Sequence, residues 1–202
     1  MNTLKIGLAG YMGAGKSTCS EMFAGRDAAV IDADREAKVL MRNDCGIKRK
    51  LVETFGSEVI CNGEISFARL GAFVFDSIVN IRKLNSIVHP PLLEHLYRLL
   101  NSIQEPIVVL DASLIPLWNI DNWFDLRLWV DASEETRLER VYKRSQNSLP
   151  KEQIKERMLI QQELFQAPSE ECWDYILNDG NVDVLRNAVD RICENIRPEV
   201  LS

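Results

Sequence analysis

Short apolar runs alternate with longer segments of helical spacing along most of the chain. The apolar runs are typical of buried parallel strands, which are covered on both faces. They fall at residues 4–9, 28–31, 106–111, 125–131 and 174–178. Helical patterns follow over 17–24, from 35, from 133 and over 182–196. This alternation predicts an α/β fold built on a parallel sheet.

The segment from Ala37 to about Ile103 departs from this alternation, because it is almost entirely helical in pattern. The dipeptide Asn62-Gly63 predicts a tight hairpin turn within it. Pro90-Pro91 predicts the end of one helix and the start of another. On local evidence His89 is more typical of a helix junction than of a catalyst. The segment is too long for a simple strand crossover, so we expect an inserted helical lobe suited to a second substrate.

Gly10 follows the first apolar run and opens Gly-x4-Gly-Lys-Ser, the pattern of a phosphate-binding loop. Glycines let backbone N–H groups surround phosphate oxygens, and a helix that begins near Gly15 directs its positive end toward them. Lys16 would contact the β- and γ-phosphates, and the Ser17 hydroxyl would bind Mg²⁺. The strand–loop–helix context favours this interpretation over a ligand-free glycine turn. The motif therefore predicts an ATP site that uses Mg²⁺.

Carboxylates stand at the ends of two predicted strands. Asp32 and Asp34 are two residues apart, so on an extended segment both face the ligand-binding edge of the sheet. Asp34 also suits the cap of the helix that begins at Arg35, and the two roles are compatible. Asp111 is placed like a Walker-B carboxylate, which holds Mg²⁺ through water. The residues leave open whether Asp111 or Asp32 makes that contact.

Two cationic helices follow the fourth predicted strand. Ser133 is expected to cap a helix that carries Arg137, Arg140 and Arg144 on one face. A second cationic helix follows the polar break at 145–150. One interpretation is a solvated hairpin whose charges pair with its own glutamates. The other is a mobile lid that lays guanidinium groups over nucleotide phosphates, and the phosphate loop favours this lid.

Composition narrows the class of protein only slightly. The chain is 46% hydrophobic and 27% charged, and no apolar run reaches the ~20 residues that a membrane helix needs. The first predicted strand begins at residue 4, so no secretory leader is expected. Five scattered cysteines predict reduced thiols in the cytoplasm. A net charge of −6 argues against broad binding of nucleic acid, and no motif for a protein partner is visible.

Taken together, the motifs resemble the dephospho-CoA kinase family over nearly the whole chain. They are the phosphate loop, Val30-Ile31-Asp32-Ala33-Asp34, Leu84-Asn85-x3-His89-Pro90, the pair Arg140 and Arg144, Arg157-x3-Gln161 and Asp174-Tyr175-Ile176-x-Asn178. The resemblance implies a three-layer P-loop kinase fold with a five-stranded parallel core sheet. The expected parts are a core (1–36, 104–140 and 169–202), a helical substrate lobe (37–103) and a helical lid (141–168).

The same resemblance implies phosphoryl transfer from ATP to the ribose 3′-hydroxyl of 3′-dephospho-CoA, which gives coenzyme A and ADP. The matched catalytic residues are Asp34, Lys16, Arg144 and Arg140, with Asp34 activating the hydroxyl. The matched nucleotide-binding residues are Gly10, Gly13, Ala14, Gly15, Lys16, Ser17, Thr18, Asn178 and Gly180. The matched substrate residues are Asp32, Asp34, His89 and Pro90.

Two features depart from the family pattern. Ala9 stands where a threonine usually precedes the first loop glycine, and Ser113-Leu114-Ile115-Pro116-Leu117 replaces a Pro-Leu-Leu-Phe-Glu-like segment. The missing glutamate allows a changed acceptor. The alternatives are therefore a shikimate- or nucleoside-type kinase, or a catalytically silent nucleotide-binding regulator. The long helical lobe argues against a compact shikimate kinase, and the retained Lys16, Asp34 and Arg144 argue against a silent protein.

Overall fold

A computed structural model describes residues 3–75, 77–180 and 182–200, without the side chains of 195–200. The chain forms two compact units. Residues 1–32 and 102–202 make up the first, which we call the core unit. Residues 33–101 make up the second, the helical unit. The expected helical lobe covered 37–103, so the observed unit begins four residues earlier and ends two residues earlier.

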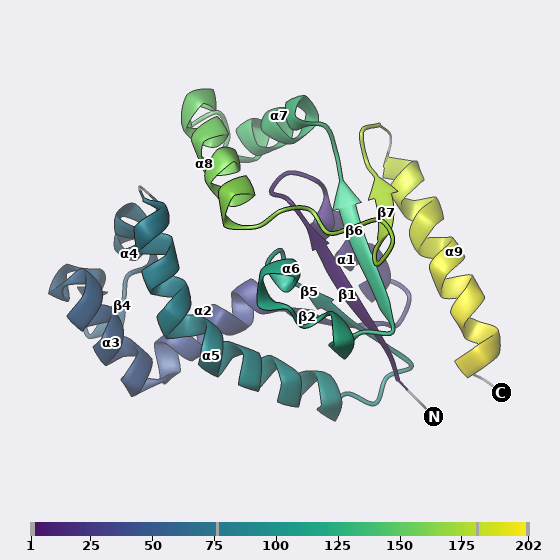
Figure 1. Ribbon diagram of the computed structural model, residues 1–202, viewed down its shortest axis with the longest axis horizontal. Coiled ribbons are helices and arrows are strands. Elements are labelled where there is room, and N and C mark those ends of the chain that lie inside the picture. Colours follow the sequence, from purple (N-terminus) through teal and green to yellow (C-terminus); the bar gives the residue numbers. More distant parts are fainter. Residues whose placement is uncertain (1–2, 76, 181, 201–202) are drawn as a thin grey trace. The chain divides into compact units, whose positions relative to one another are not determined.

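The core unit is built on one five-stranded parallel sheet (Figure 1). Its strands are β1 (Leu4–Gly10), β2 (Ala29–Asp32), β5 (Ile107–Asp111), β6 (Leu126–Asp131) and β7 (Asp174–Leu177). Their order in the sheet is β2-β5-β1-β6-β7, and each neighbouring pair is parallel. Each strand overlaps one of the apolar runs, which confirms the predicted sheet.

Helices follow the strands of the core unit. They are α1 (Lys16–Ala24), α6 (Ile115–Trp118), α7 (Glu134–Arg144), α8 (Lys151–Leu164) and α9 (Val182–Val200), with a 3₁₀ turn, η2 (Asp121–Trp123). On one face of β1, Ile6 and Leu8 are buried in a cluster with Phe23 of α1 and Val189 of α9. On the other face Gly7 lies against the Phe124 ring, which leaves no room for a Cβ. Because successive side chains of β1 point to opposite faces of the sheet, both faces are packed. Asn181, the last residue of the predicted turn at 179–181, lies outside the described residues.

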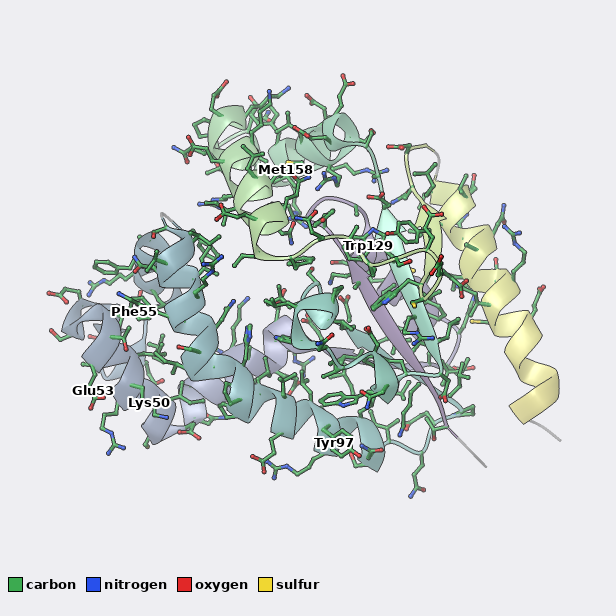
Figure 2. All side chains as sticks on the ribbon, in the orientation of Figure 1. Lys50, Glu53, Phe55, Tyr97, Trp129 and Met158 are labelled. Carbon is green, nitrogen blue, oxygen red and sulfur yellow. The ribbon has the colours of Figure 1, made fainter. Side chains whose placement is uncertain are left out.

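The two cationic helices form a hairpin. Leu138 and Val141 of α7 pack against Ile154 and Met158 of α8, and Figure 2 shows Met158 between the two helices. The Ser133 hydroxyl accepts a hydrogen bond from the Thr136 N–H at 3.4 Å, which confirms the predicted cap. Lys151 of α8 also forms an ion pair with Glu139 of α7. These contacts join the two helices into one hairpin, and its action as a lid stays a prediction.

The helical unit contains four helices and a small hairpin among its described residues. They are α2 (Ala33–Asn43), α3 (Cys45–Phe55), a 3₁₀ turn η1 (Ser57–Val59), β3 (Ile60–Cys61), β4 (Glu64–Ile65), α4 (Phe67–Val74) and α5 (Ile78–Ser102). Asn62 and Gly63 both have positive φ, 52° and 79°. They join β3 and β4 as an antiparallel pair, so the Asn-Gly turn is confirmed.

The predicted helix break at Pro90-Pro91 is wrong. Helix α5 runs without interruption through both prolines. Each proline removes one backbone donor and crowds the preceding turn, at a cost of about 3 kcal/mol in an ordinary helix interior. Val88, Leu92, Leu96 and Leu100 are buried at intervals of four residues along the same helix. We attribute the continuity to this apolar stripe, whose burial offsets the local penalty.

The local geometry predicted for Asp32 and Asp34 is also wrong. The structure ends β2 at Asp32 and begins α2 at Ala33. Asp34 therefore lies inside the first helical turn, not at the cap, and does not share an extended segment with Asp32. A carboxylate in the first turn is still favourable, because it faces the positive end of the helix dipole.

Among the described residues, no helix is long and apolar enough to span a bilayer.

Candidate active site

The loop between β1 and α1 has the geometry of a phosphate-binding loop. Gly13 and Gly15 adopt φ values of 80° and 107°, which residues with a Cβ rarely adopt. A Cβ at Gly13 would also lie 2.6 Å from the backbone oxygen of Arg137. Gly15 is the N-cap of α1 and has no side chain that could cap the first N–H groups of the helix. N–H groups at such a helix start can bind an anion.

A buried charge pair lies beside this loop. The Lys16 ammonium forms an ion pair with Asp111 at the end of β5, and these side chains are only 14% and 7% exposed. The Ser20 hydroxyl donates to the other Asp111 oxygen, Oδ2, at 2.6 Å. Sequence reasoning missed Ser20, although its spacing of four from Lys16 places both on one face of α1. Lys16 and Ser20 thus satisfy both oxygens of a buried carboxylate.

The residues expected near magnesium suit such an ion. Asp32 and Asp111 end neighbouring strands and are partners in the strand register. Ser17 is exposed in the first turn of α1. Hydroxyl and carboxylate oxygens are the ligands that Mg²⁺ prefers, often through water. Among the residues described, no group of three or more His, Cys, Asp or Glu side chains forms a complete metal cage. This arrangement suits an ion that arrives with a nucleotide.

The opposite side of the loop is held by Arg140 and Asn178. Arg140 Nη1 donates to the Ala14 oxygen at 3.2 Å, and Asn178 Nδ2 donates to the same oxygen at 2.7 Å. The structure therefore brings two predicted site residues to the loop. The resemblance matched Asn178 to the adenine region, which stays a prediction, and the structure shows that its buried amide also supports the loop backbone. Arg144 in the last turn of α7 is exposed, as is Gly180.

Arg137 differs from the other two arginines on its helix. Its side chain is buried, and its Nε donates to the Ala132 oxygen at 3.1 Å. Its guanidinium group lies over the ring of Tyr11, a loop residue, at 5.0 Å from the centroid. Arg137 therefore supports the phosphate loop from within the fold, and the expectation that it extends over the phosphates as part of a lid is wrong.

Residues at the end of α8 also contact the loop. Gln161 Oε1 accepts from the Met12 N–H at 2.9 Å. The Phe165 ring lies 5.5 Å from that of Tyr11, and the Tyr11 hydroxyl donates to the Phe165 oxygen. Trp129, labelled on β6 in Figure 2, completes this aromatic cluster. Sequence patterns gave no signal for the cluster, because its members lie far apart in the chain.

The remaining predicted substrate residues belong to the helical unit. Asp34 is exposed in the first turn of α2, and Pro90 is exposed on α5. His89 is partly buried, and burial lowers its pKa from 6.5 to about 4. At neutral pH its imidazole is therefore neutral. In this structure the imidazole carries no positive charge at that pH.

The parallel sheet, the glycine loop and the Lys16–Asp111 pair define a P-loop phosphotransferase fold. The family model for dephospho-CoA kinase matches residues 4–183, so the chain belongs to that family. A dephospho-CoA kinase from Bacillus cereus is 34% identical over 197 residues, which cover 96% of this chain and 97% of the relative. One from Thermobifida fusca is 34% identical over 160 residues, which cover 78% and 79%.

Solved structures have the same fold. TT1252 from Thermus thermophilus superposes with a TM-score of 0.73 at 25% identity, covering 96% of this chain and 98% of that one. Dephospho-CoA kinase from Campylobacter jejuni gives 0.59 at 18% identity, with coverage of 96% and 97%. A shikimate kinase from Acinetobacter baumannii gives 0.52 at 17% identity, covering 100% and 97%. The last two likenesses concern the fold alone. The family match therefore decides against the shikimate-type alternative.

Proposed function

We propose that this protein transfers the γ-phosphoryl group of ATP to the 3′-hydroxyl of 3′-dephospho-CoA, giving coenzyme A and ADP. The family match over residues 4–183 carries the proposal. The phosphate loop, with Lys16 beside it and Arg140 bonded to its backbone, supports the choice of a nucleotide as phosphoryl donor. ATP and dephospho-CoA are its proposed small-molecule partners, and the cytoplasmic location stays a prediction.

Nucleotide binding would exchange the partner of Lys16. In the structure Lys16 neutralises Asp111. The β- and γ-phosphates carry more negative charge than one carboxylate, so Lys16 would move to them. Ser20 would keep Asp111 oriented through its bond to Oδ2. Ser17, with Asp111 or Asp32 acting through water, would hold Mg²⁺, which supplies positive charge to the phosphate oxygens.

Asp34 would orient the acceptor hydroxyl and take its proton. Arg140 is already bonded to the loop backbone, and Arg144 lies one helical turn further along α7. The transferring phosphoryl group spreads negative charge over its oxygens, and these two guanidinium groups would stabilise that charge. Chemistry of this kind depends on positioning and charge more than on covalent catalysis.

The test is release of ADP from ATP and Mg²⁺, with and without dephospho-CoA, together with the mass of the product. We expect ADP that depends on dephospho-CoA and a product heavier by one phosphate. Asp34→Asn should lower kcat by roughly 100-fold or more with little change in ATP affinity, since it removes the proton acceptor. Asp27→Asn is the matched control, because Asp27 is an exposed turn residue with φ 63°, which asparagine also tolerates.

Two outcomes would contradict parts of the proposal. Near-normal turnover by Asp34→Asn would exclude Asp34 as the base and leave the reaction intact. Tight binding of ATP with no ADP from the wild-type protein would instead indicate a silent nucleotide-binding regulator.

A further inference from the structure

The core unit contains a cavity of about 470 Å³ that the phosphate loop does not line. One wall is the segment after β5, which includes α6 and the start of η2, with Leu117, Asn119 and Asp121. The other wall is the connection from α8 to β7, from Leu164 to Trp173. Figure 1 shows this connection passing the α6 segment. The volume is in the range of pockets that hold small molecules.

The cavity is adjacent to the phosphate loop. Phe165 lines it and also contacts Tyr11, with the ring centroids 5.5 Å apart. Helix α6 begins four residues after Asp111, so the other wall starts from the same edge of the sheet. Ligands of open α/β sheets bind outside this edge. A molecule that reacts at the γ-phosphate can therefore extend into the cavity.

The lining selects against phosphate. No lysine, arginine or histidine is among the described residues that line the cavity. The one carboxylate there is Asp121, whose buried Oδ1 accepts no hydrogen bond from any described residue. A phosphate would face this carboxylate with no cation to offset the repulsion. A neutral ligand avoids this repulsion.

The remaining lining suits an uncharged chain of mixed polarity. Leu117, Phe165 and Pro168 provide apolar surface, while Asn119 and Gln166 provide amide donors and acceptors. The described lining thus combines apolar and amide groups with the single carboxylate of Asp121.

We propose that this cavity receives the pantetheine arm of the acceptor, which rests on the function proposed above. The arm is uncharged, carries amides and a hydroxyl, and ends in a thiol, so its groups match the lining. The diphosphate of the same molecule stays outside, because the cavity offers it no cation. Leu117, Phe165 and Asp121 would then determine specificity for an acceptor that bears the arm.

The first test uses Cys172, an exposed thiol that lines the cavity, as a reporter. The other exposed cysteines, Cys45 and Cys61, are replaced by serine. Cys19 and Cys193 are buried, and burial raises the pKa of Cys19 to about 12, so neither should compete for an alkylating reagent. The ligand is S-methyl-dephospho-CoA, whose blocked thiol does not consume the reagent.

We expect saturating S-methyl-dephospho-CoA to slow alkylation of Cys172 at least fivefold. ADP, the product bound at the phosphate loop, has no arm and should leave the rate unchanged, so it separates a block of the cavity from a response to nucleotide at the loop. Equal rates with and without the arm-bearing ligand, in an enzyme that turns over dephospho-CoA normally, would overturn the cavity assignment alone. Absence of turnover in the wild-type protein would instead count against the proposed function.

The second test fills the cavity. Leu117→Trp should raise KM for dephospho-CoA at least tenfold and leave KM for ATP within twofold, since the change blocks only the arm. Val184→Trp is the control, because Val184 is 50% exposed on α9 and does not line the cavity. Equal changes in both KM values, or none in either, would contradict the assignment.

Discussion

The phosphate loop and the centre of α5 both carry strong backbone signals, yet the fold follows only one of them. In the loop, Gly13 and Gly15 adopt the positive φ values that their sequence pattern predicts. In α5, Pro90 and Pro91 lie in the middle of a continuous helix, where sequence reasoning predicts a break. The contrast separates a backbone preference set by steric overlap from one set by a finite energy penalty.

The difference lies in what each conformation excludes. A Cβ at Gly13 would lie 2.6 Å from the backbone oxygen of Arg137. A Cβ at Gly15 would overlap the Asn178 amide and displace it from its hydrogen bond to Ala14. A proline in a helix loses one hydrogen bond and strains one turn, which is a finite penalty. Packing elsewhere in the same helix compensates for a finite penalty, whereas a steric overlap with a fixed backbone or side chain has to be avoided.

The largest expected effect is at the loop. Gly15→Ala should lower kcat/KM for ATP by roughly 100-fold or more, because the loop must move away from the conformation that aims its N–H groups at phosphate. Steady-state kinetics with varied ATP measures this. Gly25→Ala is the control, since a Cβ there meets only ordinary contacts at 3.6 Å and φ is −67°. Equal kcat/KM for ATP in Gly15→Ala and Gly25→Ala would show that the loop can rearrange to accommodate a Cβ.

A smaller effect concerns His89 in α5. Its pKa in the folded state is about 4, below the ordinary 6.5, so between these values the unfolded chain binds a proton that the folded chain does not. Stability should therefore fall as pH falls from 6.5 toward 4, by roughly 2–3 kcal/mol in total. Urea unfolding at pH 7 and pH 4.5 measures the loss. His89→Gln should remove the part of the acid-induced loss of stability that His89 causes. A loss as large in the variant as in the wild type would refute the role of His89.

The smallest effect is at the prolines. Pro90→Ala with Pro91→Ala should stabilise the protein by about 1–2 kcal/mol, because the two helix donors that return outweigh the greater freedom of the unfolded chain. The midpoint of urea unfolding measures the change. Pro116→Ala should give no such gain, since Pro116 stands at the start of α6, where proline is tolerated. A double variant less stable than the wild type would mean that the prolines contribute packing that alanine cannot replace.

Much of the fold and part of the site were predictable from local patterns. The five strands, the Asn62-Gly63 turn, the Ser133 cap and the phosphate loop each depend on a few neighbouring residues. The pairing of Lys16 with Asp111 and the contact of Arg140 with Ala14 join residues that are 95 and 126 positions apart. The motifs suggested that such residues gather at one site, but only the strand order β2-β5-β1-β6-β7 places them together.

The sequence by itself determined the class of this protein, because glycines at fixed spacing and apolar runs of strand length constrain the backbone locally. The tertiary structure alone decided that α5 continues through two prolines and that Asp34 lies within a helical turn. It also decided that Arg137 turns under Tyr11 while Arg140 bonds to the loop backbone. These outcomes depend on burial and contacts among distant residues, whose energies outweigh local preferences of a few kcal/mol.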